Sequence, residues 1–367
     1  MHIPFTRPDI TEAELAAVCS VLRSGRLTGG ETTRRFALKL ARYTGADGCV
    51  CASSATAGLI AALLFCRVGP GDEVIVPAYT FTATAACVTA VGAKPVFADV
   101  PEGSFHLDAD GVESCLSPRT KAVLAVDFGG VCCDYEAIRA VCPPGVAVIA
   151  DAAHALGAQS CGTMADLTVF SFHAVKNLTT AEGGAVVWRL PGRCPGEVEK
   201  TLSHLLLHGL DRASPIKCCA ADYDVLFPGT KGNLPDVLAA IGLSQLSRYD
   251  AMLSRRLSVC RRYDAALPPG WTALQHDETT SAHLYAALLP EGLDRGAVFA
   301  QFAREEIECS VHFRPLPLTT AWRPCASAPA AYPNAEALWR RELSLPLSSV
   351  MTDEEVDAVC AALKRYA

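Results

Sequence analysis

A stretch near the middle of the sequence places one lysine between two apolar runs. Residues Leu167 to Phe172 are β-branched and aromatic, which predicts a buried strand. Lys176 follows closely, and Gly183-Gly184 then turns the chain into a second apolar run, Ala185 to Trp188. An arbitrary lysine is most often a solvated surface charge. A lysine held between buried strands is costly unless its amine loses its charge or forms a covalent bond, and a desolvated amine is what a Schiff-base lysine requires.

The length and composition predict a folded protein with two domains. A chain of 367 residues is too long for one small core and suits one larger and one smaller domain. Half of the residues are hydrophobic and 19% are charged, which indicates a globular protein without extensive disorder. The net charge of −7 argues against a general role in binding nucleic acid or membrane surfaces. No uninterrupted apolar run approaches transmembrane length.

The seventeen cysteines raise the question of disulfides or metal binding. Their number is odd, and no Cys-x-x-Cys pair occurs, the close pairs being Cys49/Cys51, Cys132/Cys133 and Cys218/Cys219. The first residues lack the apolar core of a signal peptide. We therefore expect a reduced, cytoplasmic protein that uses cysteine as a small core residue and has no metal site.

Two further junctions between a strand and a helix carry polar side chains. Cys49 to Ala52 predicts a short strand that enters Ser53 to Leu59, where free amides and a Thr hydroxyl at a helix start suit a phosphate group. A simple helix cap is the common alternative there. The apolar run Gly145 to Ala150 ends at Asp151, with His154 just beyond. Ligands of open α/β sheets bind beyond the carboxyl ends of strands, although Asp151 also suits a helix cap and His154 a core position.

Periodicity predicts the remaining elements. Thr11 and Glu14 form a capping box before apolar positions at helical spacing. The expected helices are Thr11–Leu22, Thr32–Tyr43, Ala78–Ala86, Val237–Leu246, Leu246–Leu267, Asp294–Glu305 and Met351–Leu363, and the further strands are Val91–Val100, Lys121–Asp127 and Ala282–Leu289.

The lysine segment Ala165 to Gly184, together with Asp151 and the Ser-Ser-Ala-Thr motif at Ser53, closely resembles the DegT/DnrJ/EryC1/StrS family of sugar aminotransferases. These enzymes use pyridoxal 5′-phosphate (PLP). The resemblance covers nearly the whole chain and implies an α/β fold, the PLP-dependent transferase fold type I. It further implies a large PLP-binding domain with a mostly parallel sheet, residues 1–245, and a small C-terminal α+β domain, residues 246–367.

The resemblance implies a role for individual residues. Lys176 is the expected catalytic residue, which carries the cofactor. Asp151 is expected at the pyridinium nitrogen of the cofactor, where a carboxylate keeps that nitrogen protonated. The full set expected to bind PLP is Ala55, Thr56, Phe81, Asp151, His154, Ser171 and, from the partner subunit of a homodimer, Asn233. Sequence alone also allows core packing for Phe81 and an ordinary surface loop for the segment that carries Asn233.

The expected substrate-binding residues come from both ends of the chain: Phe5, Arg26, Leu27, Thr28, His312, Phe313 and Arg314. Arg26 to Thr28 lie in a glycine-rich loop similar to one that family members place beside the substrate. His312 to Arg314 match a family segment near the sugar. Pro317 stands where many members have a second histidine, which leaves the identity of the substrate open.

The resemblance implies transfer of an amino group from an amino acid, by analogy L-glutamate, to the C4 keto group of a nucleotide-linked sugar in cell-surface polysaccharide synthesis. Among family members the chain is most similar to the C4 aminotransferases for UDP-linked 4-keto sugars, of the 4-amino-4-deoxy-arabinose type. Aminotransferases for 3-keto sugars or cyclitols are alternatives, as is a non-enzymatic regulatory or scaffold protein. A sugar dehydratase of this family is disfavoured, because those members replace the lysine with histidine.

Overall fold

The larger part of the protein is built on one seven-stranded sheet. The computed structural model describes residues 1–211, 223–326 and 331–366. The strands lie in the order β1-β7-β6-β5-β4-β2-β3. Their bounds are β1 Gly48–Ala52, β2 Glu73–Pro77, β3 Lys94–Ala98, β4 Thr120–Val126, β5 Ala147–Asp151, β6 Leu167–Ser171 and β7 Gly184–Trp188.

The five strands from β6 to β3 run parallel, and β7 and β1 extend the sheet in antiparallel fashion. The predicted α/β fold with a mostly parallel sheet is therefore confirmed. Parallel sheets are covered by helices on both faces, which is why their strands read as nearly continuous apolar runs. Every residue of β2 and β7 is buried, in agreement with this rule.

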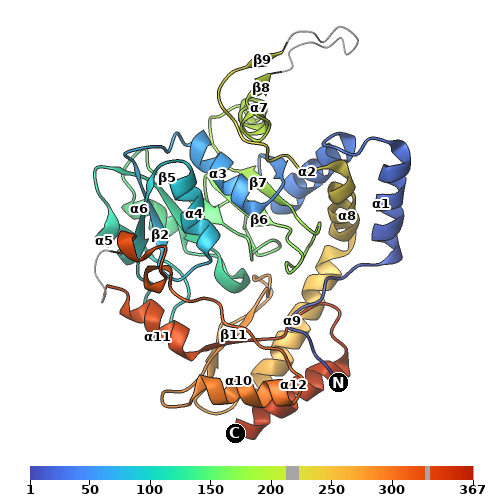
Figure 1. Cartoon of the computed structure of the whole chain (residues 1–367), viewed down its shortest axis with the longest axis vertical. Helices are drawn as coiled ribbons and strands as arrows, with labels where there is room; N and C mark the ends of the chain where they lie inside the picture. Colours follow the sequence, from blue (N-terminus) through green and yellow to red (C-terminus); the bar gives the residue numbers. More distant parts are fainter. Residues whose placement is uncertain (212–222, 327–330, 367) are drawn as a thin grey trace.

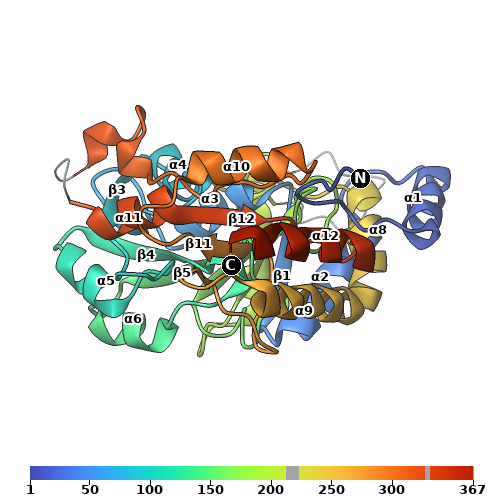
Figure 2. The ribbon, with the colours of Figure 1, turned by 90° about the horizontal axis from the view of Figure 1, so that it is seen from below.

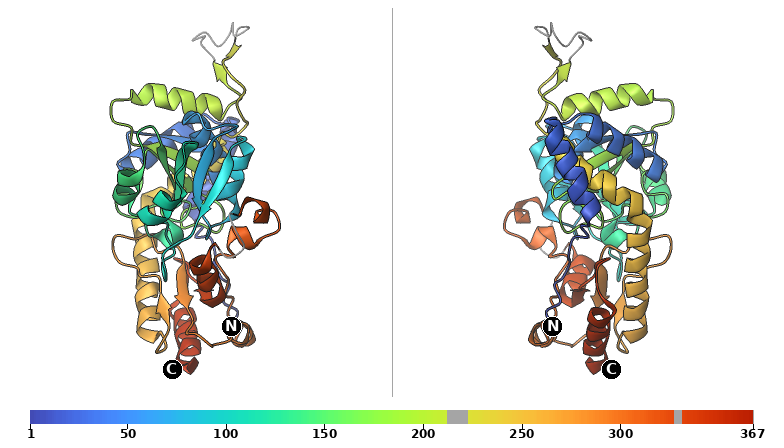
Figure 3. Two further views of the ribbon diagram at one scale, coloured as in Figure 1. Left: turned by 90° about the vertical axis from the view of Figure 1, so that its left-hand side faces the viewer. Right: turned by 90° about the vertical axis from the view of Figure 1, so that its right-hand side faces the viewer.

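Helices cover both faces of this sheet (Figure 1). The helices of the larger part are α1 Glu12–Ser24, which packs on α8 and not on the sheet, α2 Glu31–Thr44, α3 Ala55–Phe65, α4 Thr82–Ala90, α5 Ala109–Cys115, α6 Tyr135–Val141, α7 Pro195–Leu205 and α8 Asp236–Gln245. A two-stranded ribbon, β8 Leu210–Asp211 and β9 Asp224–Val225, projects beyond α7 (Figure 3). Cys218 and Cys219 lie outside the described residues, and the other fifteen cysteines are free thiols.

The predicted helix Ala78–Ala86 is wrong at its start. The helix begins only at Thr82, because Ala78 continues the β2–β3 ladder by donating its N–H to the Ala98 carbonyl at 2.7 Å. Phe81 has extended backbone angles, φ −71° and ψ 148°. This extended connection brings Phe81 to the carboxyl edge of the sheet.

Helix α1 has the predicted capping box, but it exposes its apolar side chains and buries a charged one, the reverse of a usual surface helix. Leu15 and Leu22, which the periodicity assigned to an apolar face, are each 51% exposed, whereas Glu14 is buried. The Glu14 carboxylate accepts hydrogen bonds from Thr11, Ser244 and Arg248. These bonds outweigh the cost of burial and lower the Glu14 pKa to about 2. The apolar face of α1 is therefore turned to solvent.

The C-terminal part contains a small antiparallel sheet, β10 Thr272–Ala273, β11 Tyr285–Leu288 and β12 Glu342–Leu345, in that order. Its helices are α9 Tyr249–Ala266, α10 Arg295–Arg304, α11 Pro333–Arg341 and α12 Asp353–Leu363, with short 3₁₀ turns at Leu246–Arg248, Leu316–Leu318, Arg323–Cys325 and Lys364–Tyr366. Figure 2 shows β11 and β12 between α10 and α9. None of the helices in the described ranges is both long and apolar enough to cross a membrane.

Two predicted elements of this part are shorter in the structure. The helix expected from Leu246 starts with a 3₁₀ turn and becomes α-helical at Tyr249. The strand expected over Ala282–Leu289 begins only at Tyr285, because Ala282 has a positive φ of 45°. Ser281 and His283 instead donate their N–H groups to Gly130 and Gly129, which ties this segment to the large part.

The N-terminal residues pack with the C-terminal part. Ile3 forms a bridge with Ile307 and is buried in the core around the small sheet. A second apolar core joins residues of both parts, including Val76 and Leu124 from the large sheet and Ala286 and Leu288 from the small one. A domain boundary between residues 245 and 246 stays a prediction.

Candidate active site

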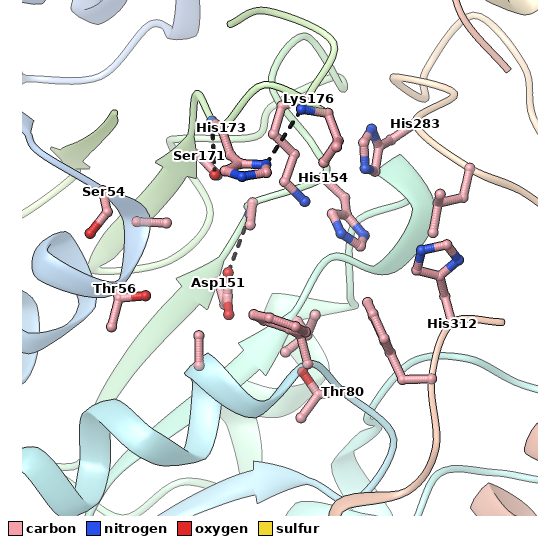
Figure 4. Close-up of a pocket in the computed structure, with 18 of the residues that line it drawn as sticks. Ser54, Thr56, Thr80, Asp151, His154, Ser171, His173, Lys176, His283 and His312 are labelled. Carbon is pink, nitrogen blue, oxygen red and sulfur yellow. Dashed lines mark hydrogen bonds between the residues drawn. The ribbon is translucent and has the colours of Figure 1, made fainter. Parts of the chain in front are cut away.

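A cavity of about 360 Å³ opens at the carboxyl edge of the large sheet, where the C-terminal part faces it. Lining residues come from the ends of β4, β5 and β6, from the start of α3, from the segment before α4, and from the loops around His283 and His312. Figure 4 shows the polar side chains in this space, with Lys176 and Asp151 near its centre. The location agrees with the rule for ligands of open α/β sheets.

Lys176 reaches the cavity from the loop after β6, where its N–H donates to the His173 carbonyl at 2.9 Å. Among the described residues, none accepts a hydrogen bond from the Lys176 amine. Burial lowers the pKa of this amine from 10.5 to about 8, although the negative charge of Asp151 opposes the shift. About a tenth of the amine is therefore uncharged and nucleophilic at pH 7, far more than for a surface lysine.

Asp151 is the last residue of β5 and is buried at the base of the cavity. Its carboxylate accepts hydrogen bonds from the Thr84 hydroxyl at 2.8 Å and the Ala153 N–H at 3.3 Å. Burial raises the Asp151 pKa, while these hydrogen bonds and Lys176 lower it by less. The site thus holds a buried carboxylate that a cationic group of a ligand would stabilise.

The start of α3 forms another wall, lined by Ser54, Ala55 and Thr56. Ser54 caps the helix by accepting a hydrogen bond from the Ala57 N–H at 3.1 Å. Gly184 lies against this helix start, since a Cβ atom on it would approach the Ala55 nitrogen within 2.6 Å. The Gly183-Gly184 turn therefore lets β7 pack against the helix N-terminus, and Ser171 at the end of β6 faces the same space.

Two imidazole rings, those of His154 and His283, lie beside Lys176 with centroids 4.3 Å apart. The Gly129 N–H donates to His154 Nδ1 at 3.2 Å, and His283 Nδ1 lies 2.9 Å from the Asn177 side-chain oxygen. Burial and the nearby Lys176 charge hold both pKa values well below the usual 6.5. Both rings are therefore neutral at physiological pH. His154 is therefore a buried, hydrogen-bonded histidine, as the core alternative predicted, and it also borders the cavity.

Aromatic rings enclose the opposite side. Phe81 is 56% exposed and borders the cavity, so core packing of its ring is excluded. Its ring centroid lies 5.8 Å from that of Phe313, and Phe5 stacks on His312 at 5.4 Å. The cavity thus offers a flat apolar boundary next to its polar centre.

Several predicted site residues lie outside this cavity in the single chain. Arg26, Leu27 and Thr28 are exposed in the loop between α1 and α2. Asn233 lies next to that loop, because a Cβ atom on Gly29 would be 3.2 Å from the Asn233 side-chain nitrogen. Arg314 points away, donating to the Leu318 carbonyl and lying over the Trp339 ring at 5.3 Å.

The cavity also contains residues that the sequence analysis did not assign to the site. They are Thr6, Ser54, Leu59, Thr80, Ala83, Val126, Ala153, His173, Val175, Glu182, Gly183, His283, Leu284 and Leu347, and Thr84 supports Asp151 from behind. His283 is the most informative of them, since it lies 107 residues after Lys176 yet contacts the Asn next to it. A polar residue directly before the apolar run Leu284 to Leu289 was the available signal.

One group within the described residues has metal-ligand spacing. The ligand atoms of Asp127, Cys132 and Cys161 lie within 4.8 Å of one another. Asp127 already accepts hydrogen bonds from the Cys133 N–H, the Tyr135 hydroxyl and the Cys161 thiol. We therefore interpret the cluster as a hydrogen-bonded support for the loop after β4.

Comparison with known proteins identifies relatives over the whole length of the chain. The sequence profile of the DegT/DnrJ/EryC1/StrS aminotransferase family matches residues 8–364. The spore coat polysaccharide biosynthesis protein SpsC of Bacillus subtilis is 37% identical over 379 aligned positions, which cover 99% of this chain and 96% of SpsC. Spr1654 from Streptococcus pneumoniae, described as a candidate sugar aminotransferase, is similar in structure and also 37% identical. Its form with pyridoxamine 5′-phosphate (PMP) gives a TM-score of 0.95 over 100% of this chain and 99% of that one.

The PLP form of the same Streptococcus protein gives a TM-score of 0.94, covering 100% of this chain and 98% of that one. The lysine segment, the strand order and these matches over the full length therefore agree. This chain belongs to the DegT/DnrJ/EryC1/StrS aminotransferase family and is a PLP-dependent transaminase of fold type I.

Proposed function

We propose that the protein transfers an amino group from an amino acid, L-glutamate by family analogy, to the C4 keto group of a nucleotide-linked sugar, uridine diphosphate being the favoured nucleotide. The observation that carries this proposal is the Lys176 amine, which borders the cavity without a hydrogen-bond partner among the described residues. Such an amine suits both a covalent bond to an aldehyde and the acceptance of a proton from a neighbouring carbon.

The residues around Lys176 fit pyridoxal phosphate. Asp151 would pair with the ring nitrogen, and its burial strengthens that interaction because little water competes. The amides of Ala55 and Thr56 at the start of α3, with the hydroxyls of Thr56 and Ser171, would hold the phosphate. Phe81 and His154 would bound the ring. When bound, the cofactor supplies an electron sink for the carbon that loses its proton.

The side chains of the protein then have distinct tasks. Lys176 would move a proton between the donor carbon and the cofactor, as an amine with a pKa of about 8 is able both to accept and to release one near neutral pH. Asp151 would keep the ring nitrogen protonated. Phe5, His312 and Phe313 would contact the substrate from the C-terminal side of the cavity.

The sugar acceptor is supported by relatives. SpsC is named for spore coat polysaccharide biosynthesis, and Spr1654 is described as a candidate sugar aminotransferase. The C4 position rests on the resemblance of Ser53 to Leu59 and of Phe170 to Gly184 to enzymes that aminate 4-keto nucleotide sugars. A 3-keto sugar or a cyclitol ketone is the second candidate, because Pro317, which is buried, stands where many members have histidine and leaves the substrate open.

We further propose a homodimer with shared active sites. The exposed apolar residues Leu15 and Leu22 of α1 need a covering surface, and Leu27 nearby is 45% exposed. Arg26 to Thr28 and Asn233 lie outside the cavity of their own chain, which is expected if they complete the site of the partner. A scaffold protein without activity would not require the unpartnered amine of Lys176. The cytoplasmic location stays a prediction.

The test is direct. Purified protein with PLP is incubated with L-glutamate and a panel of 4-keto and 3-keto nucleotide sugars and cyclitol ketones, and products are identified by mass spectrometry. Amination of a UDP-linked 4-keto sugar, with formation of 2-oxoglutarate, is the expected result. Efficient amination of a cyclitol ketone without activity on any 4-keto nucleotide sugar would reject the proposed acceptor.

A further inference from the structure

Strand β12 presents two polar side chains to the segment that carries His312. Successive side chains of a strand point to opposite faces, so Glu342 and Ser344 share one face while Leu343 and Leu345 share the other. Leu343 and Leu345 are buried in the apolar core around the small sheet. Backbone hydrogen bonds between Ser310 and Ser344, at 2.9 and 3.0 Å, hold the His312 segment against β12.

A chain of hydrogen bonds joins Glu342 to the His312 ring. His312 Nδ1 lies 2.9 Å from Ser344 Oγ, and Ser344 Oγ lies 2.5 Å from Glu342 Oε1. The other oxygen of Glu342 accepts the His312 backbone N–H at 2.8 Å. All three residues are thereby fixed relative to one another, and Glu342 itself is fully buried.

The pocket end of this chain is His312 Nε2. The ring borders the cavity, and within the described part of the protein Nε2 forms no hydrogen bond. Burial, with a contribution from Lys176, lowers the His312 pKa to about 4, so the ring is neutral at physiological pH. A neutral imidazole carries one N–H, and the partner of Nδ1 decides which nitrogen has it.

We propose that Glu342 and Ser344 are positioning residues that fix the tautomer of His312 and make its Nε2 a hydrogen-bond donor to the carbonyl oxygen of the keto substrate. This inference rests on the proposed aminotransferase function. The donor would stabilise the partial negative charge that develops on that oxygen when an amine adds to the carbonyl carbon.

The donor and acceptor roles along these hydrogen bonds depend on whether the Glu342 carboxyl carries a proton. The Ser344 hydroxyl has a single hydrogen. With a neutral Glu342, the carboxyl donates to Ser344, Ser344 donates to His312 Nδ1, and the ring proton is on Nε2. With an ionised Glu342, Ser344 must donate to the carboxylate, His312 Nδ1 must donate to Ser344, and Nε2 becomes an acceptor.

The surroundings favour the neutral carboxyl below mildly alkaline pH. Burial raises the Glu342 pKa from 4.5 to about 8, opposed by smaller effects of Ser344, the His312 N–H and the Arg295 charge. Tyr79 and Cys309 also lie near enough to interact with Glu342, and both are neutral because burial raises their pKa values. The donor form of Nε2 is therefore present below about pH 8 and lost above it.

The first experiment reads the tautomer directly. Nitrogen-15 NMR of the holoenzyme labelled at histidine, with His312 assigned by comparison with His312→Gln, is recorded from pH 6 to 10. We expect the Nε2–H form at low pH and conversion to the Nδ1–H form at high pH. Glu342→Gln keeps the donor pattern, because its amide donates to Ser344 and its oxygen accepts the His312 N–H, so the Nε2–H form should persist at every pH.

The second experiment measures function without needing the identity of the sugar. The enzyme loaded with pyridoxamine 5′-phosphate is mixed with 2-oxoglutarate, and single turnovers are followed by absorbance over the same pH range. Ser344→Ala should slow the reaction by about tenfold or more, since a misplaced acid loses most of its effect. Ser344→Thr should restore the rate, and Glu342→Gln should weaken the decline above pH 8. Glu336→Gln, a carboxyl-to-amide change in a surface ion pair, is the control.

The outcomes separate the two proposals. Failure of the wild-type enzyme to react with glutamate or 2-oxoglutarate argues against glutamate as the amino donor, while the NMR experiment still decides the role of Glu342 and Ser344. A His312 tautomer that is independent of pH in the wild type, or a pH response of the tautomer that is unchanged in Ser344→Ala and Glu342→Gln, overturns the inference. Variants that lose only thermal stability, with wild-type pH profiles, also overturn it.

Discussion

Replacing Lys176 with methionine should stabilise the cofactor-free protein while abolishing transamination. Methionine has nearly the same length as lysine and no charge, so it fills the same space in the cavity wall. Burial makes the charged amine of Lys176 less stable in the folded protein than in water, and this lowers its pKa from 10.5 to about 8. The folded state therefore carries a cost that the variant does not have.

The size of this cost follows from the two pKa values. Their difference corresponds to about 3 kcal/mol at roughly 1.36 kcal/mol per pKa unit. Because the side chain borders a cavity that admits some water, we expect a measured gain of about 2 kcal/mol. With an unfolding entropy of about 2.1 cal/mol/K per residue, this gain raises Tm by roughly 3 °C.

The pH dependence gives a sharper check. The folded pKa lies below the unfolded value, so the cost is complete below pH 8 and disappears as pH rises toward 10.5. The Tm difference between variant and wild type, measured by calorimetry of cofactor-free protein, should shrink over that range. Lys39→Met, at an exposed position of α2, should show no comparable gain. A destabilised Lys176→Met, or a gain that does not depend on pH, would refute the reasoning.

Three further outcomes are expected. Borohydride reduction of the yellow holoenzyme should fix the cofactor on the peptide that contains Lys176, and labelling of another lysine would assign the role elsewhere. Asp151→Asn should keep the fold and some cofactor but lose activity by about 10²-fold or more, because an amide does not hold the ring nitrogen protonated; near wild-type turnover would contradict this. Mixing Asn233→Ala with Lys176→Ala under subunit exchange should raise activity above either parent, since one site of each mixed dimer carries neither change; no recovery in demonstrated mixed dimers would mean unshared sites.

Local patterns were sufficient for most of the fold. The strands around Lys176 were predictable because apolar β-branched runs of four to eight residues have few alternatives to a buried strand. The capping box at Thr11 was predictable because it involves residues only three positions apart. The carboxyl end of β5 indicated Asp151 as a ligand-facing residue, because parallel strands share one functional edge.

Long-range contacts decided the rest. The orientation of α1 depends on Arg248 and Ser244, more than 200 residues from Glu14, and no local periodicity reports them. The extended connection at Phe81 exists because Ala78 pairs with Ala98.

The sequence by itself determined the lysine and the carboxylate of the site, because each depends on one strand and the residues that follow it. It indicated the fold class through the family resemblance, which covers nearly the whole chain. Only the tertiary structure placed His283 beside Asn177 and linked Glu342 through Ser344 to His312. The first contact joins segments 106 residues apart, one in each part of the protein, and the contact of Ser344 with His312 joins segments 32 residues apart within the C-terminal part. Neither geometry exists before the chain has folded. The protonation states of His283, His312 and Glu342 therefore depend on tertiary contacts that local sequence patterns do not report.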